Sequence, residues 1–411
     1  MKFSDFSHPM ETILLDDRHL RELIAAHRPG RSLERDFYTS PQIFERDMQR
    51  VYLRHWLFVG HVARIPKAGD YFLYPLAGES VIVVRAKDGG VRALLNVCPH
   101  RGSRICLEPE GRATKLVCPY HAWSFDLDGT FLTARHLPEG ADPAELGLRR
   151  VQVQVVEGLI HLCFAEEPPD FGPVAADLRK FFGPHGLPEA KIAVRTSLVL
   201  RANWKIAAEN FFECYHCLPT HPELTHVMSY VRAAESARLA GERRDYTARW
   251  EARARALGHV TGANKRHDGA CHTVCRIPIR EGFLTQSEGG RPVAPLMGRF
   301  KEYDGGVTAM QFFPINWFVA DNDYAMLVRF NPLALQETEA EITWLVHPDA
   351  VEGRDYDVGA LTWLWGGTLR EDQKITEDNQ AGVNSRFYRP GPHSKEEQLD
   401  EFLQWYLRQI G

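Results

Sequence analysis

The spacing of hydrophobic residues changes twice along the chain and divides it into three stretches. The first forty residues have a helical texture, and we expect a helical lead-in over residues 1–45. From Trp56 to about Phe164, short apolar runs rich in β-branched and aromatic residues alternate with turn signals such as Asp88–Gly90. This alternation predicts a β-rich domain over residues 46–165.

Several strands of this domain stand out as separate runs. An Asp-Gly pair at residues 128 and 129 lies between two short apolar runs, an order that is typical of a β-hairpin. The expected strands are Tyr71–Tyr74, Val81–Val84, Ala93–Asn96 and Leu159–Leu162, and the expected hairpin joins Trp123–Phe125 to Thr130–Leu132.

The third stretch, residues 166–411, begins with a linker at Glu166–Asp170 and mixes helices with strands. One helix with a single buried face is predicted from apolar residues at helical spacing: Trp204, Ala207, Ala208, Phe211 and Tyr215. The charged segment 235–258 predicts a solvated helix, and 396–410 a closing helix. Sheet strands are expected at Thr308–Phe313, Ala325–Phe330 and Glu341–Val346. The predicted fold class is α+β, a β-rich domain followed by a domain in which helices flank an antiparallel sheet.

Composition and charge exclude several classes of protein. The 411 residues exceed what one hydrophobic core normally holds, so two or more domains are expected. Lysine and arginine number 49 against 54 acidic residues, so no basic excess exists to bind nucleic acid. Apolar runs such as Gly158–Phe164 are too short to span a bilayer, and the first residues lack the pattern of an export signal. We therefore expect a cytoplasmic protein with neither nucleic acid nor a membrane as partner.

Eight cysteines and eighteen histidines supply candidate metal ligands. In a reducing compartment we expect the cysteines to be thiols or metal ligands rather than disulfides. Four of these residues form two half-sites, Cys98-x-His100 and Cys118-x-x-His121, separated by seventeen residues. Tetrahedral zinc is one interpretation, although zinc fingers usually pair Cys with Cys and His with His. Mixed half-sites suit a [2Fe–2S] cluster in which one iron takes both cysteines and the other both histidines.

These half-sites resemble those of Rieske proteins. The resemblance implies that Cys98 and Cys118 hold one iron of a [2Fe–2S] cluster, and that His100 and His121 hold the other. The remaining cysteines lack a matching half-site, and we expect them to be structural. They are Cys106, Cys163, Cys271, Cys275 and the pair Cys214-x-x-Cys217, which is expected to pack in the middle of a helix.

A second set of candidate ligands follows in the third stretch. Glu209, Glu213 and His216 are spaced i, i+4, i+7, so a continuous helix would place them on one face. Pro219 would end that helix and let His221 turn back toward His216. Two histidines and a carboxylate on one face of Fe(II) leave positions open for O₂ and substrate.

The chain here resembles the large, alpha subunits of Rieske non-heme iron oxygenases, and the resemblance covers nearly its whole length. The family pattern of an acid, two residues, His, four residues and His is met by Glu213, His216 and His221. The resemblance implies that the two histidines bind a mononuclear iron, while Glu213 links His216 to a cluster histidine of a neighbouring subunit. It places the third ligand at Asp372, eight residues before Gln380 in a Gln-x-Gly stretch.

Three other residues compete for these roles. His226 repeats the five-residue step from His221, but it lacks the upstream acid. Glu371 and Asp378 flank the expected carboxylate ligand and are interpreted as solvated helix charges.

The resemblance also implies the reaction partners. A flavin or iron-sulfur reductase would pass electrons from NAD(P)H to the cluster, and the mononuclear Fe(II) would use O₂ to oxygenate a small molecule. Electron transfer between subunits implies a homotrimer. A pure electron carrier with a degenerate second domain is disfavoured, because both histidines and Asp372 are present.

The substrate is expected to be a quaternary ammonium or betaine-like compound that loses an N-methyl group by hydroxylation. Three segments resemble the glycine betaine, stachydrine and carnitine branch: Phe313–Trp317, Trp344–Asp357 and Arg389–Pro392. The alternative is a ring-hydroxylating dioxygenase or monooxygenase of an aromatic acid. Aromatic residues are candidates for a cation-binding cage. They are Phe211, Phe212, Tyr215, Phe312, Phe313, Phe318 and, as the first to test, Trp317.

Overall fold

The computed structural model describes residues 17–137, 139–228, 230–231, 236–264, 271–394 and 396–411. Within these ranges the chain forms antiparallel sheets with helices packed against them, as the predicted α+β class requires. None of the helices described is both long and apolar enough to cross a membrane.

The chain enters the fold through short helices, as predicted, although residues 1–16 of the expected lead-in lie outside the described residues. Ser40 caps one of these helices by accepting a hydrogen bond from the backbone N–H of Ile43. The elements are α1 (Asp17–Ala26), α2 (Asp36–Thr39), α3 (Pro41–Asp47) and the π-helical turn η1 (Met48–Tyr52).

The first large sheet has seven strands in the order β1-β10-β9-β4-β3-β2-β5. Its strands are β1 (Leu57–His61), β2 (Asp70–Leu76), β3 (Glu79–Arg85), β4 (Val91–Leu95), β5 (Glu110–Arg112), β9 (Arg150–Val156) and β10 (Leu159–Cys163). A separate three-stranded sheet contains β6 (Leu116–Val117), β7 (Ser124–Phe125) and β8 (Phe131–Thr133). The pairing of β7 with β8 confirms the predicted hairpin around the Asp-Gly turn.

The second large sheet has the order β11-β17-β16-β15-β14-β13-β12. Its strands are β11 (Lys191–Leu200), β12 (Gly262–Ala263), β13 (His272–Pro278), β14 (Gly306–Phe312), β15 (Asn316–Ala320), β16 (Tyr324–Ala334) and β17 (Glu337–Val346). Both faces are covered, because Leu327 of β16 packs in the core under α4 (Gly172–Phe181), while Val328 packs in the opposite core with α10 (Val358–Val383). Burial on both faces explains why β16 is a continuous apolar run rather than an alternating one.

The remaining helices lie around the second sheet. They are α5 (Trp204–Phe211), α6 (Cys217–Thr220), α7 (Pro222–Val227), α9 (Ala237–Ala256) and α11 (Glu397–Ile410). Short 3-10 turns are η2 (Val62–Arg64), η3 (Pro143–Leu146), η4 (Gly183–His185), η5 (Leu187–Glu189) and η6 (Glu288–Gly290). The predicted solvated helix is confirmed, because α9 is largely exposed apart from Trp250 and Ala254.

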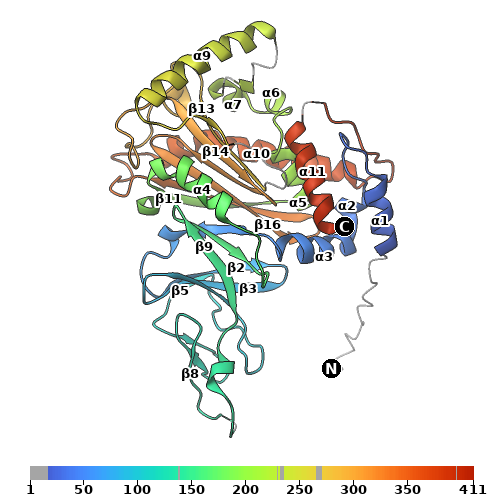
Figure 1. Ribbon diagram of the computed structural model, residues 1–411, viewed down its shortest axis with the longest axis vertical. Coiled ribbons are helices and arrows are strands. Elements are labelled where there is room, and N and C mark those ends of the chain that lie inside the picture. The colour runs from blue at the N-terminus through green and yellow to red at the C-terminus, as the bar shows by residue number, and fades with distance from the viewer. Residues whose placement is uncertain (1–16, 138, 229, 232–235, 265–270, 395) are drawn as a thin grey trace, which may run out of the picture.

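The two large sheets meet where β2 approaches β16. The amide of Asn331 donates to the carbonyl oxygen of Pro75 at 2.9 Å, and Arg64 forms an ion pair with Glu341 at 3.4 Å. Figure 1 shows the small sheet with β8 at one end of the molecule and α6 and α7 at the other. The predicted cluster loops and the predicted iron-binding segment therefore lie at opposite ends of the folded molecule.

Candidate metal centres

The segment that carries the two histidines is irregular, contrary to the prediction of one continuous helix. Helix α5 ends at Phe211, whereas His216 precedes α6 and His221 follows it. The Glu213 carboxylate explains the break, because it accepts hydrogen bonds from the backbone N–H groups of Tyr215 and His216 that a helix would use. Tyr215 is 58% exposed, so its predicted place on the buried helix face is wrong.

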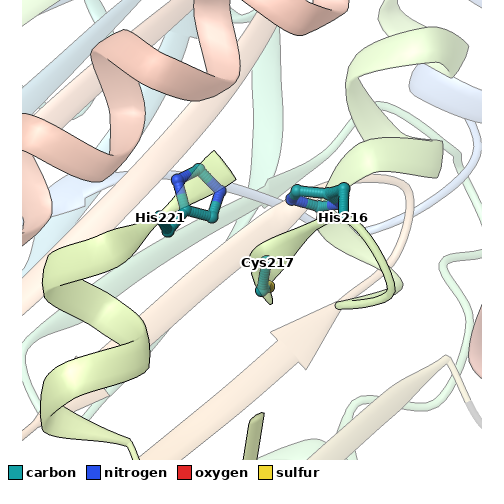
Figure 2. Close-up of side chains that lie close together, drawn as sticks. All are labelled: His216, Cys217 and His221. Atoms are coloured by element: carbon teal, nitrogen blue, oxygen red, sulfur yellow. The ribbon is translucent and has the colours of Figure 1, made fainter. Parts of the chain in front are cut away.

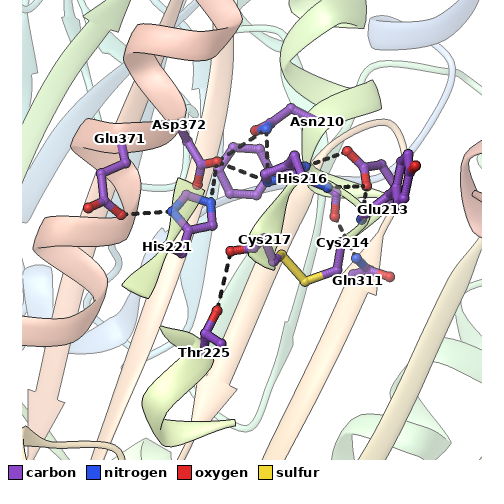
Figure 3. A network of polar contacts seen from close by, with 12 residues as sticks. Asn210, Glu213, Cys214, His216, Cys217, His221, Thr225, Gln311, Glu371 and Asp372 are labelled. Carbon is purple, nitrogen blue, oxygen red and sulfur yellow. Dashed lines mark hydrogen bonds and ion pairs between the residues drawn. A yellow bond between two sulfur atoms is a disulfide. The ribbon is translucent and has the colours of Figure 1, made fainter. Parts of the chain in front are cut away.

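The structure nevertheless brings the three predicted ligands together. The Nε2 atoms of His216 and His221 lie 3.3 and 3.0 Å from the same carboxylate oxygen, Oδ1 of Asp372 (Figure 3). Asp372 comes from the middle of α10 and is 4% exposed. Asn210 from α5 donates to this oxygen at 3.1 Å. Two ring nitrogens and a buried carboxylate oxygen thus converge from α5–α7 and α10.

Each imidazole is also held by a second carboxylate. Oε1 of Glu213 contacts Nδ1 of His216, and Oε2 of Glu371 lies 2.8 Å from Nδ1 of His221. A proton on each Nδ1 leaves the Nε2 lone pair free, which is the arrangement that a metal-binding histidine requires. The interpretation of Glu371 as a solvated helix charge is therefore wrong. Its position beside Asp372 was visible in the sequence, but nothing there indicated that it would contact His221.

The pKa values of the two histidines reflect these carboxylates. Burial lowers the pKa of His216, but hydrogen bonds to Asp372 and Glu213 outweigh burial and raise it to about 9. Burial likewise lowers the pKa of His221, and hydrogen bonds to Asp372 and Glu371 raise it above its ordinary value. A site that attracts protons this strongly in the absence of metal is electrostatically suited to a divalent cation.

The competing residues lie outside this group. Asp378 is exposed and pairs with Lys374 at 2.6 Å, as expected for a solvated helix charge. His226 is exposed and contacts Arg280 rather than the two histidines. Glu209 points toward the N-terminal helices, where it accepts a hydrogen bond from Tyr38 at 2.6 Å. Burial raises the pKa of Glu209 to about 7.

A cavity of about 830 Å³ opens beside the histidines and Asp372. Its aromatic wall includes Phe211, Trp317 and Trp365, and the two indole rings meet edge to face with centroids 4.6 Å apart. Trp365 of α10 was missed by sequence reasoning, because it lies 48 residues beyond Trp317 on a different element. Among the described residues that line the cavity there is no lysine or arginine.

The other aromatic candidates are placed differently. Phe212 lines the cavity, whereas Phe312, Phe313 and Phe318 are buried in the hydrophobic cores. A larger groove of about 1140 Å³ elsewhere on the surface is lined largely by charged residues of η1, β9 and the segment after β10. It contains none of the candidate metal ligands, so the smaller cavity is the candidate substrate site.

The predicted cluster loops lie between β4 and β5 and between β6 and β7. Cys98 and Cys118 are each 2% exposed, while His100 and His121 are exposed with ring centroids 4.7 Å apart. Gly102 has a φ of +74° and turns the first loop back, so that its N–H donates to the Cys98 carbonyl oxygen at 2.9 Å.

The pKa values of the two cluster thiols are shifted in opposite directions. Burial raises the pKa of the Cys118 thiol, but the backbone N–H groups of Tyr120 and His121 contribute to lowering it overall. Burial raises the pKa of Cys98, and the adjacent Cys118 sulfur raises it further. Two adjacent sulfurs below two exposed imidazoles fit an iron-sulfur cluster with its histidine-bound iron nearer the surface.

The remaining cysteines divide into free thiols and one disulfide. Cys106, Cys163, Cys271 and Cys275 are free, as expected. Cys214 and Cys217 form a disulfide, so the expectation that every cysteine is a thiol or a metal ligand is wrong for this pair (Figure 3). The pair also lies in the turn after α5 and at the start of α6 rather than in the middle of a helix.

Comparison with known proteins finds relatives for both parts of the chain. Residues 187–411 match the ring hydroxylating alpha subunit (catalytic domain) family, and residues 55–151 match the Rieske [2Fe-2S] domain family. The glycine betaine monooxygenase oxygenase subunit of Pseudomonas aeruginosa strain UCBPP-PA14 is 36% identical over 387 residues, which cover 92% of this chain and 89% of that protein. The carnitine monooxygenase oxygenase subunit of Escherichia coli K12 is 36% identical over 194 residues, 45% of this chain and 51% of that protein.

Solved structures show the same fold. The quaternary ammonium Rieske monooxygenase CntA, in complex with an inhibitor, superposes with a TM-score of 0.72 and 21% identity over 95% of this chain and 98% of that chain. The chain therefore belongs to the ring-hydroxylating oxygenase alpha subunits that carry a Rieske domain. It is an oxygenase subunit whose cofactors are a Rieske [2Fe–2S] cluster and a mononuclear iron, and a separate reductase supplies its electrons.

Proposed function

We propose that the protein is a monooxygenase that hydroxylates an N-methyl group of a quaternary ammonium substrate. The observation that carries this proposal is the cavity beside Asp372, which has a wall of Trp317 and Trp365 and lacks a lysine or arginine among its described lining residues. A quaternary ammonium ion donates no hydrogen bonds, so aromatic faces are its best partners, each contributing about 0.5–2 kcal/mol. The similarity to glycine betaine monooxygenase subunits supports the same substrate class.

The ligand assignments are part of the proposal. Cys98, His100, Cys118 and His121 would hold the cluster, and His216, His221 and Asp372 would hold the mononuclear iron. When bound, these two groups supply single electrons and the activation of O₂. One O₂, two electrons and two protons convert the N-methyl group to N-hydroxymethyl and water. The hydroxymethyl compound then releases formaldehyde, a proton and the tertiary amine.

The chain's own residues orient the donors and the substrate. Glu371 holds the proton of His221 on Nδ1, and Glu213 does the same for His216, so both Nε2 atoms stay directed at Asp372. Asn210 restrains the Asp372 carboxylate. Trp317 and Trp365 would hold the ammonium group against the wall of the cavity, so that one methyl group faces the metal.

We further propose that Glu213 links the two metal centres across a homotrimer. Glu213 and His216 line a second pocket of about 300 Å³, together with Glu396 and His393. The small sheet whose β6–β7 loop carries Cys118 and His121 lies at the other end of the molecule from α6 and α7 (Figure 1), so we propose that a neighbouring subunit supplies the electrons. The exposed His100 or His121 of that neighbour would approach Glu213 through this pocket.

We also propose a division of the chain into two domains that follow the N-terminal lead-in. Residues 46–165 would form the Rieske domain after the lead-in of residues 1–45, and residues 166–411 the catalytic domain. The electron donor would be a flavin or iron-sulfur reductase that takes electrons from NAD(P)H.

A substrate panel tests the proposal. The purified protein would be supplied with a reductase and NADH, and offered glycine betaine, stachydrine, carnitine, choline and benzoate-type acids in turn. We expect formaldehyde release with one or more of the quaternary ammonium compounds and none with the aromatic acids. Formation of a ring diol from an aromatic acid, without formaldehyde from any ammonium compound, would establish ring hydroxylation instead.

A further inference from the structure

A fourth potential metal donor lies beside the two histidines. A nitrogen of each imidazole and the Sγ atom of Cys217 all lie within 4.8 Å of one another (Figure 2). Cys217 is 4% exposed, and its carbonyl oxygen accepts a hydrogen bond from the backbone N–H of His221 at 2.9 Å. The two imidazoles therefore belong to two overlapping donor sets, one completed by Asp372 and the other by Cys217.

The disulfide decides whether the second set can act. In the structure, the Cys217 sulfur is bonded to Cys214, three residues away. Cysteine sulfur binds a metal effectively only as a thiolate, so a sulfur in a disulfide cannot act as a ligand here. Both cysteines line the 830 Å³ cavity, so a small reductant that enters the cavity reaches the bond.

We propose that the oxidation state of the Cys214–Cys217 pair controls which metal binds, and we call this pair a redox gate. Its reduction creates a zinc site from His216, Cys217 and His221. A dithiol reductant donates two electrons and two protons, the S–S bond breaks into two thiols, and the dithiol becomes a disulfide. The Cys217 thiol then loses its proton to solvent as zinc binds. This inference does not depend on the substrate of the enzyme, although it shares two of the proposed iron ligands.

Ligand chemistry favours zinc at the reduced site. Zinc bonds of about 2.0–2.1 Å to nitrogen and about 2.3 Å to sulfur place tetrahedral donors roughly 3.3–3.6 Å apart. The donors therefore need to approach by about 1 Å, on a short irregular segment whose Cys217 and His221 are already joined by a backbone hydrogen bond. Thiolate ligands select zinc, and zinc also binds more tightly than Fe(II) at a given site.

The second donor set would also change the coordination sphere. Asp372 contacts both imidazoles, whereas the donors that lie close to the Cys217 sulfur are the two histidines. Zinc bound to Cys217 and the two histidines would occupy both imidazoles, which the proposed iron site also needs. Reduction in the presence of zinc is thus expected to exclude iron from the site, and the disulfide to preserve an iron site with three protein ligands.

Zinc affinity measured against a chromophoric chelator tests the gate. The protein would keep its cluster and lose its mononuclear metal, and it would be titrated in the oxidised form and after reduction with a phosphine that does not bind zinc. Cys214→Ser leaves Cys217 as a permanent thiol, Cys217→Ser removes the thiol, and the double variant is the matched control. We expect reduced wild type and Cys214→Ser to bind zinc at least tenfold more tightly than oxidised wild type and Cys217→Ser. X-ray absorption at zinc should then detect one sulfur neighbour.

Two results would overturn the proposal. One is equal zinc affinity in the oxidised and reduced wild-type protein, which requires no variant and so does not depend on whether Cys214→Ser folds. The other is a zinc site without sulfur in the reduced protein. Visible absorption of the cluster, followed throughout, shows that zinc has not replaced it at Cys98 and Cys118. No turnover is measured, so a failure here leaves the proposed N-demethylation to be judged on its own assay.

Discussion

Glu371 provides the sharpest test of how the proposed iron site is held together. Its carboxylate contacts Nδ1 of His221 at 2.8 Å, and its side chain is 34% exposed, whereas the His221 side chain is 1% exposed. Removing a group that hydrogen-bonds a metal-binding histidine typically weakens metal affinity by 10- to 100-fold, equivalent to about 1.4–2.7 kcal/mol. Because water reaches Glu371 and glutamine still offers a carbonyl acceptor, Glu371→Gln should weaken iron binding by roughly tenfold. Glu371→Ala loses the acceptor as well and should approach the upper end of this range.

Iron affinity would be measured by competition with a coloured Fe(II) chelator under anaerobic conditions, with the cluster spectrum as the check on folding. Asp378→Asn is the matched control, because Asp378 is an acid on the same helix that pairs with the exposed Lys374. Its iron affinity should equal that of wild type. The reasoning is refuted if Glu371→Ala binds iron as tightly as wild type, or if Asp378→Asn weakens binding to the same extent.

Four further predictions concern the rest of the molecule. Cys98→Ser should abolish the visible absorption and the Rieske EPR signal, while Cys106→Ser should retain both, and loss of the signals in both variants would undermine the ligand assignment. Trp317→Leu should raise KM for a quaternary ammonium substrate about 2- to 30-fold with a smaller change in kcat, as expected for one lost aromatic face, and Trp317→Phe should restore much of the binding. Lys205→Met should lower the free energy of unfolding by about 3–5 kcal/mol in urea titrations, because it leaves the fully buried Asp47 without its ion-pair partner. Lys374→Met, at an exposed ion pair, should change the free energy of unfolding by less than about 1 kcal/mol. Burial raises the pKa of Glu209 to about 7, so the folded state holds a proton that the unfolded state releases near pH 4.5. The free energy of unfolding should therefore fall by up to about 3 kcal/mol as pH rises from 5 to 8, and Glu209→Gln should remove this pH dependence.

The parts of the fold that could be predicted are those set by one continuous pattern. The strand at Ala325–Phe330 was predictable because both of its faces are buried, so that its apolar residues run without interruption. The candidate cluster ligands could be named from the sequence because their half-sites are short and each lies in one loop. Asp372 was proposed only through its spacing to a family pattern, since it reaches the histidines from a helix about 150 residues further on.

Other features depend on contacts that no local pattern encodes. Apolar spacing continues past Phe211 to Tyr215, but the Glu213 side chain takes the backbone N–H groups that a longer helix would need. Glu371 became a partner of His221 only because α10 crosses the segment that follows α5. The disulfide depends on the 4.9 Å approach of the Cys214 and Cys217 Cα atoms, which a continuous helix need not produce.

The most direct test of the central claim is the stoichiometry of a single coupled reaction. The purified chain, loaded with cluster and iron and supplied with reductase and NADH, would receive glycine betaine, and O₂ uptake, NADH oxidation and formaldehyde would be measured together. N-methyl hydroxylation predicts one formaldehyde and one demethylated amine for each O₂ and NADH consumed, with no formaldehyde from Asp372→Ala. If stachydrine, carnitine and choline, like glycine betaine, give no formaldehyde under these conditions while an aromatic acid gives a ring diol, the account is contradicted.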